Sequence, residues 1–142
     1  MTEKEMRDLV LRIAWKHYGR FYTWGGDDPS GFDCSGLVVE CLKSVGILKR
    51  RGDWTAAGLA KEFGERLLPA NLPPRGGDLV FWHNEAGRVI HVEICLNYML
   101  AIGASGGGSF IKSRADAIAH NAFIKVRPIQ SRRGVWGIVN PY

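Results

Sequence analysis

Apolar residues near the start of the chain recur three or four positions apart, the period of a helix with one buried face. Thr2 precedes this stretch, and Glu5 lies three residues after Thr2, which is the spacing of a capping box. Gly19 is a typical helix stop. The pattern predicts a first helix whose stripe consists of Met6, Leu9, Val10, Ile13, Ala14 and His17.

Two further helices are predicted before the middle of the chain. The second begins near Cys34 and stops at Gly46, and a shorter third runs from about Thr55 to Phe63. Residues 24–31 and 68–77 are rich in glycine and proline, so we expect irregular loops there. The apolar stripe of the second helix consists of Leu37, Val38, Cys41, Leu42 and Val45.

The hydrophobic period shortens after residue 78 and becomes typical of strands. A small helix over 115–120 interrupts the strand series. Helices followed by a sheet indicate an α+β fold, with N-terminal helices packed on a C-terminal antiparallel sheet. No repeat or linker divides the chain, so we expect one domain over residues 1–142. The predicted strands are 79–82, 89–96, 100–104, 110–112, 123–129 and 135–139.

The composition is that of an ordinary soluble globular protein, with 46% hydrophobic and 23% charged residues. No apolar run approaches the roughly 20 residues of a spanning helix, so we expect no membrane insertion. The net charge of +5 suits a polyanionic partner, such as nucleic acid, anionic lipid or cell wall. The densest basic run, 49–51, contains no aromatic residue and is interpreted as a solvated turn rather than a nucleic-acid site.

Three cysteines cannot form a complete disulfide framework. We expect Cys41 and Cys95 to be small buried hydrophobes, and the chain has no ligand spacing that predicts a metal or cofactor. Cys34 differs because it opens a helix directly after a glycine-rich loop. Unpaired N–H groups and the helix dipole favour thiolate there, and the same N–H groups can stabilise an oxyanion. A structural cysteine at a helix start remains the alternative.

A nucleophilic cysteine requires a base from another element. Of the four histidines, only His91 lies inside a predicted strand, where a rigid backbone can hold an imidazole. Alternation places His91, Glu93 and Cys95 on one face of that strand, opposite Ile90, Val92 and Ile94.

These residues resemble the NlpC-type cell-wall peptidases, a papain-like family of cysteine hydrolases. The likeness rests on residues 21–26, on 32–38 around Cys34, on 77–82 and on 91–94 around His91. It implies a papain-like fold with Cys34 as nucleophile and His91 as base. The implied reaction is hydrolysis of an amide in the peptidoglycan stem peptide, commonly between D-glutamate and a diamino acid. The resemblance also assigns Tyr22, Asp33 and Ser35 to the substrate pocket; alternatively, Tyr22 packs the loop and Asp33 caps the helix.

The chain departs from the family pattern at one position. The family usually has a third polar residue about twelve positions after the base, and this chain has Gly103 there. Where the family has a small residue two positions after the base, this chain has Glu93. We expect Glu93 to lie diagonally across from Gly103, to fill the vacated space and to orient His91. The alternative is that Ser105, a backbone carbonyl or a water holds His91 while Glu93 binds substrate. Gly103 and Ser105 are both expected to border the substrate.

Three functions are compared. The first is a monomeric peptidoglycan endopeptidase that binds stem peptide and no nucleic acid. The second is an amidase or acyltransferase of the same fold, and the third is a non-catalytic phage tail-assembly or wall-binding domain. The charged N-terminal residues do not resemble a signal peptide. We therefore expect synthesis in the cytoplasm and access to the wall through a holin, a phage tail or a secretion machine, in a phage or prophage setting.

Overall fold

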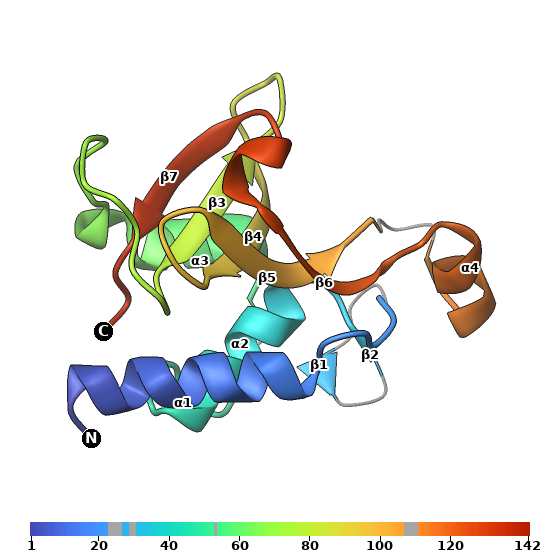
Figure 1. Cartoon of the computed structure of the whole chain (residues 1–142), viewed down its shortest axis with the longest axis horizontal. Helices are drawn as coiled ribbons and strands as arrows, with labels where there is room; N and C mark the ends of the chain where they lie inside the picture. The colour runs from blue at the N-terminus through green and yellow to red at the C-terminus, as the bar shows by residue number, and fades with distance from the viewer. Residues whose placement is uncertain (23–26, 29–30, 53, 107–110) are drawn as a thin grey trace.

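A computed structural model places the helices before an antiparallel sheet, as predicted (Figure 1). It describes residues 1–22, 27–28, 31–52, 54–106 and 111–142. The helices are α1 (Glu3–Lys16), α2 (Cys34–Ser44), α3 (Ala56–Glu62) and α4 (Arg114–Ala119), with short 3-10 turns η1 (Gly64–Arg66) and η2 (Ile129–Ser131). The strands are β1 (Asp27–Asp28), β2 (Gly31–Phe32), β3 (Leu79–His83), β4 (Val89–Cys95), β5 (Leu100–Ser105), β6 (Phe123–Pro128) and β7 (Val135–Val139).

Each of the first three helices starts at a side-chain cap. The Thr2 hydroxyl accepts the N–H of Glu5 at 3.1 Å, which confirms the predicted start of α1. Asp33 caps α2 and Thr55 caps α3 in the same way. All three predicted helices are therefore confirmed to within one or two residues at the N-terminus.

In the described residues the main sheet has five strands in the order β6-β5-β4-β3-β7, and every neighbouring pair is antiparallel. Its two faces are buried unequally. Val92 and Ile94 join the main core against α1 and α2, which lie together along one side of the sheet in Figure 1. Cys95 lies in a smaller cluster on the opposite face with Trp82, which confirms the predicted alternation along β4.

Two parts of the secondary-structure prediction are wrong. Residues 111 and 112 do not form a strand: the Lys112 N–H bonds to the carboxylate of Asp116, which directs the chain into α4. Phe110 of that predicted strand lies outside the described residues. In the predicted loop 24–31, residues 27 and 28 pair with 31 and 32 as β1 and β2, while 24–26 and 29–30 are outside the described residues.

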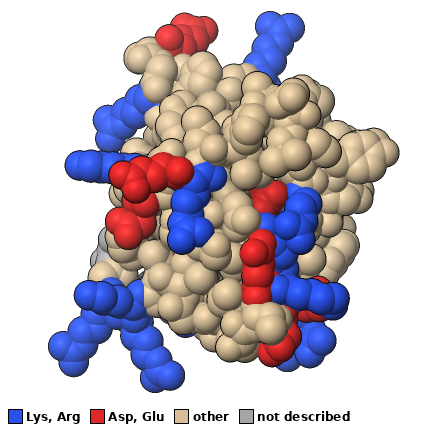
Figure 2. Space-filling model, turned by 90° about the vertical axis from the view of Figure 1, so that its left-hand side faces the viewer, with Lys and Arg blue, Asp and Glu red and all other residues tan. Residues whose placement is uncertain are grey.

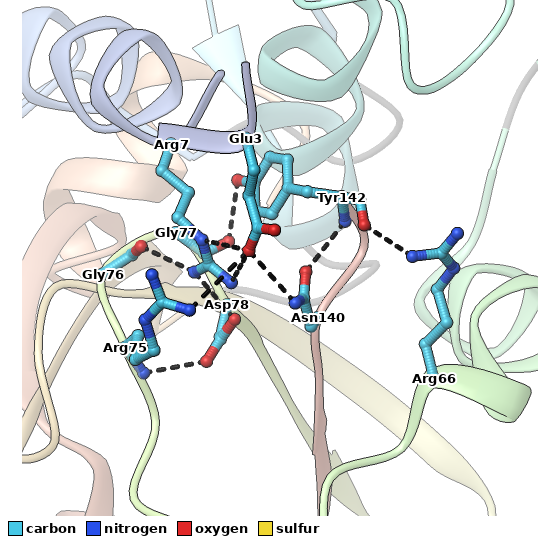
Figure 3. A network of polar contacts seen from close by, with 9 residues as sticks. All are labelled: Glu3, Arg7, Arg66, Arg75, Gly76, Gly77, Asp78, Asn140 and Tyr142. Carbon is cyan, nitrogen blue, oxygen red and sulfur yellow. Dashed lines mark hydrogen bonds and ion pairs between the residues drawn. The ribbon is translucent and has the colours of Figure 1, made fainter. Parts of the chain in front are cut away.

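A polar network joins α1 to the start of β3 and to the C-terminal segment (Figure 3). The guanidinium of Arg7 lies 2.9 Å from the carboxylates of both Asp78 and Glu3. Arg7 and Asp78 are almost fully buried, so their charges depend on one another rather than on water. The Tyr142 hydroxyl donates to the carbonyl of Gly77 at 2.8 Å. The network therefore fixes the start of β3 against α1 and the C-terminal segment.

The surface carries charge of both signs. Figure 2 shows basic and acidic side chains interspersed across one face of the molecule, rather than a continuous basic patch. In the part of the chain that the structure describes, no helix combines the length and apolarity needed to cross a membrane.

Candidate active site

Cys34 is the first residue of α2, and the helix brings it to a break in the sheet. Strands β4 and β5 are in register only at Ile94 with Ile102 and at Cys95 with Ala101. Beyond that point β5 continues as a partner of β6. The Cys95 N–H donates to the carbonyl of Asp78, directly before β3. Backbone N–H groups alternate in direction along a strand, so the Val92 N–H points to the other edge of β4, where β5 is no longer paired.

The Cys34 thiol contacts the backbone of β4 on this side. It forms a hydrogen bond with the backbone of Val92 that lowers the pKa of the thiol, so the donor is the Val92 N–H. The Ser35 N–H acts in the same direction. The thiol is therefore tethered to the backbone of the residue that directly follows His91. The roles of Cys34 and His91 as nucleophile and base stay predictions.

His91 and Glu93 form a buried pair on β4. The imidazole Nε2 lies 2.6 Å from a carboxylate oxygen of Glu93, and both side chains are almost completely shielded from water. The ring centroid of Trp82 lies 5.3 Å from that of His91 and packs beside it. Because Nε2 is occupied, Nδ1 is the ring nitrogen that remains for the thiol.

Glu93 lies directly over Gly103. A Cβ atom added at residue 103 would stand 2.3 Å from Cγ of Glu93 and 2.8 Å from its Cδ, distances that real atoms do not tolerate. The register of β4 and β5, if continued by one residue beyond Ile94 and Ile102, would set Glu93 opposite Gly103. The absent side chain at 103 is thus what leaves room for a carboxylate beside the imidazole.

Burial opposes the thiolate expected at a helix start. Burial first, and then the charges of Asp33 and Glu93, raise the pKa of Cys34 to about 11, against the opposing N–H bonds of Val92 and Ser35. Burial also lowers the pKa of His91, although the hydrogen bond to Glu93 opposes this. Both shifts disfavour the charged forms of the two side chains.

The three residues assigned to a substrate pocket lie together at the start of α2. Asp33 accepts the Gly36 N–H at 2.7 Å, so the helix-capping alternative is present in the structure. The Ser35 hydroxyl lies 3.3 Å from the same carboxylate oxygen. Tyr22 is buried, and its pKa is raised by burial and by the nearby charges of Cys34 and Asp33. Their binding roles stay predictions.

Two arginines at the site were not anticipated from the sequence. Arg127, on β6, donates to the buried hydroxyl of Ser105 at 2.5 Å and lies 3.8 Å from Glu93. Ser105 therefore contacts Arg127, and the alternative in which it holds His91 is not the arrangement found. Arg132, after η2, lies over Trp82 at 5.9 Å. Basic residues on the strand beside Gly103 were a usable signal for Arg127; nothing in the pattern pointed to Arg132.

A cysteine at the head of a buried helix and a histidine on an antiparallel sheet define a papain-like α+β domain. The sequence profile of the NlpC/P60 family matches residues 19–132, and the chain belongs to that family. The chain is 37% identical over 102 residues to Protein P54 of Enterococcus faecium, covering 72% of this chain and 17% of that protein. It is 37% identical over 90 residues to the bifunctional muramidase/DL-endopeptidase CwlT of Bacillus subtilis, covering 61% and 26%.

The chain thus spans about a quarter or less of the length of these curated relatives. Among solved structures, the NlpC/p60 domain of the peptidoglycan hydrolase SagA matches with a TM-score of 0.69 at 28% identity, covering 94% of this chain and 97% of that one. RipD from Mycobacterium tuberculosis, described as a non-catalytic NlpC/p60 domain protein adapted to peptidoglycan binding, shares the fold at 16% identity. Its TM-score is 0.67, over 95% of this chain and 96% of that one.

Proposed function

We propose that this chain is a cysteine endopeptidase that hydrolyses an amide of the peptidoglycan stem peptide, between D-glutamate and the diamino acid. The observation that carries the proposal is the Cys34 thiol bonded to the Val92 backbone beside the His91–Glu93 pair. Family relatives named endopeptidase and peptidoglycan hydrolase support the substrate class. The substrate is reached at the cell wall, and the chain acts as a monomer.

The reaction begins with both partners neutral. His91 Nδ1 accepts the thiol proton as Sγ of Cys34 attacks the scissile carbonyl carbon, and the Glu93 carboxylate stabilises the imidazolium that forms. Backbone N–H groups at the head of α2 stabilise the oxyanion. The C–N bond then breaks, the leaving amine takes the proton from His91, and a thioester remains on Cys34. Water, deprotonated by His91, hydrolyses the thioester and restores the thiol.

Purified chain incubated with stem peptides tests the proposal, with the fragments identified by mass spectrometry. Cleavage between D-glutamate and the diamino acid is expected, and Cys34→Ala and His91→Ala should abolish it. Removing either residue takes away nucleophile or base, each of which contributes orders of magnitude to the rate.

A second candidate is a wall-binding domain without activity, which the non-catalytic RipD domain of the same fold favours. The two are separated by the same incubation. Retained binding of wall fragments without any cleavage by the wild-type chain supports the binding domain. The Cys34 thiol on the Val92 backbone and the buried His91–Glu93 pair support the enzyme.

A further inference from the structure

Arg132 is held at the wall of the candidate site by Trp82. The indole N–H of Trp82 donates to the carbonyl of Arg132 at 3.3 Å, and the guanidinium carbon of Arg132 lies 5.9 Å from the indole ring centroid. The same indole ring packs against the imidazole of His91, with 5.3 Å between centroids. One tryptophan therefore positions both the catalytic base and a cation next to it.

Within the described residues, the guanidinium of Arg132 has no hydrogen bond or ion pair. Its side chain is nonetheless partly buried. Arg127 differs, because it is bound to Ser105 and lies near Glu93. Glu93 in turn is already paired with His91 at 2.6 Å. The guanidinium of Arg132 is therefore available to a carboxylate that enters the site.

The charge of Arg132 acts on the reacting groups. Burial lowers the pKa of Arg132, while the charge of Glu93, and that of Cys34 when it is ionised, raise it. In return, Arg132 contributes to lowering the pKa of His91. The geometric link is Trp82, which contacts both Arg132 and His91 and so sets the guanidinium on the His91 side of the candidate site.

We propose that Arg132 binds the free α-carboxylate of the D-glutamyl residue whose side-chain carbonyl is attacked by Cys34. The proposal rests on the proposed function and deepens it by naming a selective feature of the substrate. In a γ-linked D-glutamate this carboxylate lies on the acyl side of the scissile bond, so it enters the site with the attacked carbonyl. A planar guanidinium matches a carboxylate through two parallel hydrogen bonds. Stem peptides in which this carboxylate is amidated lack the charge and are poorer substrates.

The test compares L-Ala-γ-D-Glu-L-Lys with its α-amidated analogue, L-Ala-γ-D-isoglutamine-L-Lys. The wild-type chain should prefer the acid in kcat/KM by about 10- to 100-fold, the range of a hydrogen bond to a charged group. Arg132→Gln should lower kcat/KM for the acid to that for the amide and leave the amide almost unchanged. Arg133→Gln is the matched control, because it removes the same charge from an exposed neighbour. It should keep the wild-type preference.

The possible failures are distinguishable. Equal cleavage of the two peptides by the wild-type chain overturns this inference and leaves the proposed function standing. A loss in Arg132→Gln that is the same for both peptides overturns it too, since Arg132 would then act on the thiol or imidazole alone. Cleavage of neither peptide overturns the proposed function and the inference with it. If Arg132→Gln does not fold, Arg132→Lys replaces it, which keeps the charge without the fork and should retain part of the preference.

Discussion

Replacing Gly103 by alanine perturbs the contact that holds Glu93 against His91. The new Cβ atom would stand 2.3 Å from Cγ of Glu93, well inside the sum of the atomic radii. Gly103 is part of β5, whose pairing with β6 holds its backbone in place, and the Glu93 side chain lies over it. Neither residue can therefore move without cost. We expect the Glu93 carboxylate to leave Nε2 of His91, which it now approaches at 2.6 Å.

The expected magnitudes follow from overpacking and from the loss of an oriented base. One extra methyl group in a close-packed region costs about 1–3 kcal/mol, or roughly 4–12 °C in Tm for a domain of this size. An imidazole without its orienting carboxylate should reduce kcat about 10²–10⁴-fold. The Gly103→Ala variant is thus expected to stay folded at room temperature while its kcat falls by orders of magnitude.

The assay combines thermal unfolding with cleavage of a defined stem peptide followed by chromatography. Gly64→Ala is the matched control, because a Cβ atom at that position meets nothing within 4 Å. It should leave both Tm and kcat near their wild-type values. In the double variant E93G/G103A the collision is removed, so Tm should recover in part while kcat stays low.

Two outcomes would refute the reasoning. A Gly103→Ala variant with unchanged Tm and full turnover would mean that Glu93 does not occupy the space over residue 103. Recovery of kcat in the double variant would mean that His91 needs no carboxylate at this place.

The other predictions concern the titration of the site, the buried ion pair and the cap of α2. Because burial lowers the pKa of His91, the acidic limb of kcat/KM should have an apparent pKa below the usual 6.5 or so; a limb above 7 contradicts this. Because burial raises the pKa of Cys34 to about 11, its alkylation by iodoacetamide should still accelerate between pH 8 and 10, and a plateau near pH 6 would indicate a resting ion pair. Arg7→Met leaves Asp78 buried without its cation and should reduce the free energy of unfolding by about 3–5 kcal/mol, measured by urea denaturation. Asp33→Ala should cost about 0.5–2 kcal/mol through loss of the α2 cap, whereas Asp33→Asn retains the cap; an Asn variant as unstable as the Ala variant argues against capping.

Local patterns predicted the elements well, because each carried its own signal. Thr2 and Glu5 mark the start of α1, and the alternation around His91 correctly assigned its strand faces. The strand expected at 110–112 failed because a short apolar run does not reveal whether a partner edge is available; the Lys112 N–H bonds within the turn into α4 instead. The two-residue strands β1 and β2 are too short to produce any period.

The site was predictable only in part, because its chemistry depends on burial and register. The proximity of Glu93 to Gly103 could be proposed from their types, but how closely the Glu93 side chain covers Gly103 depends on how β4 and β5 pack together. The charge state of Cys34 was predicted from the helix dipole alone. The burial that opposes a thiolate there arises from packing between α2 and the sheet, which no local pattern contains. Arg132 directly follows η2 in a connecting segment, where residue spacing does not predict which way a side chain points.

The network around Arg7 also sets an order in which the chain can mature. On the ribosome Arg7 emerges long before Asp78, so its ionic partner is Glu3 of its own helix until the first strand of the main sheet is made. β3 likewise gains β7 as its second neighbour only after β4, β5 and β6 have been synthesised. A nascent chain stalled before residue 135 would therefore hold Cys34 and His91 in an unfinished sheet, in which β3 lacks one of its two neighbours.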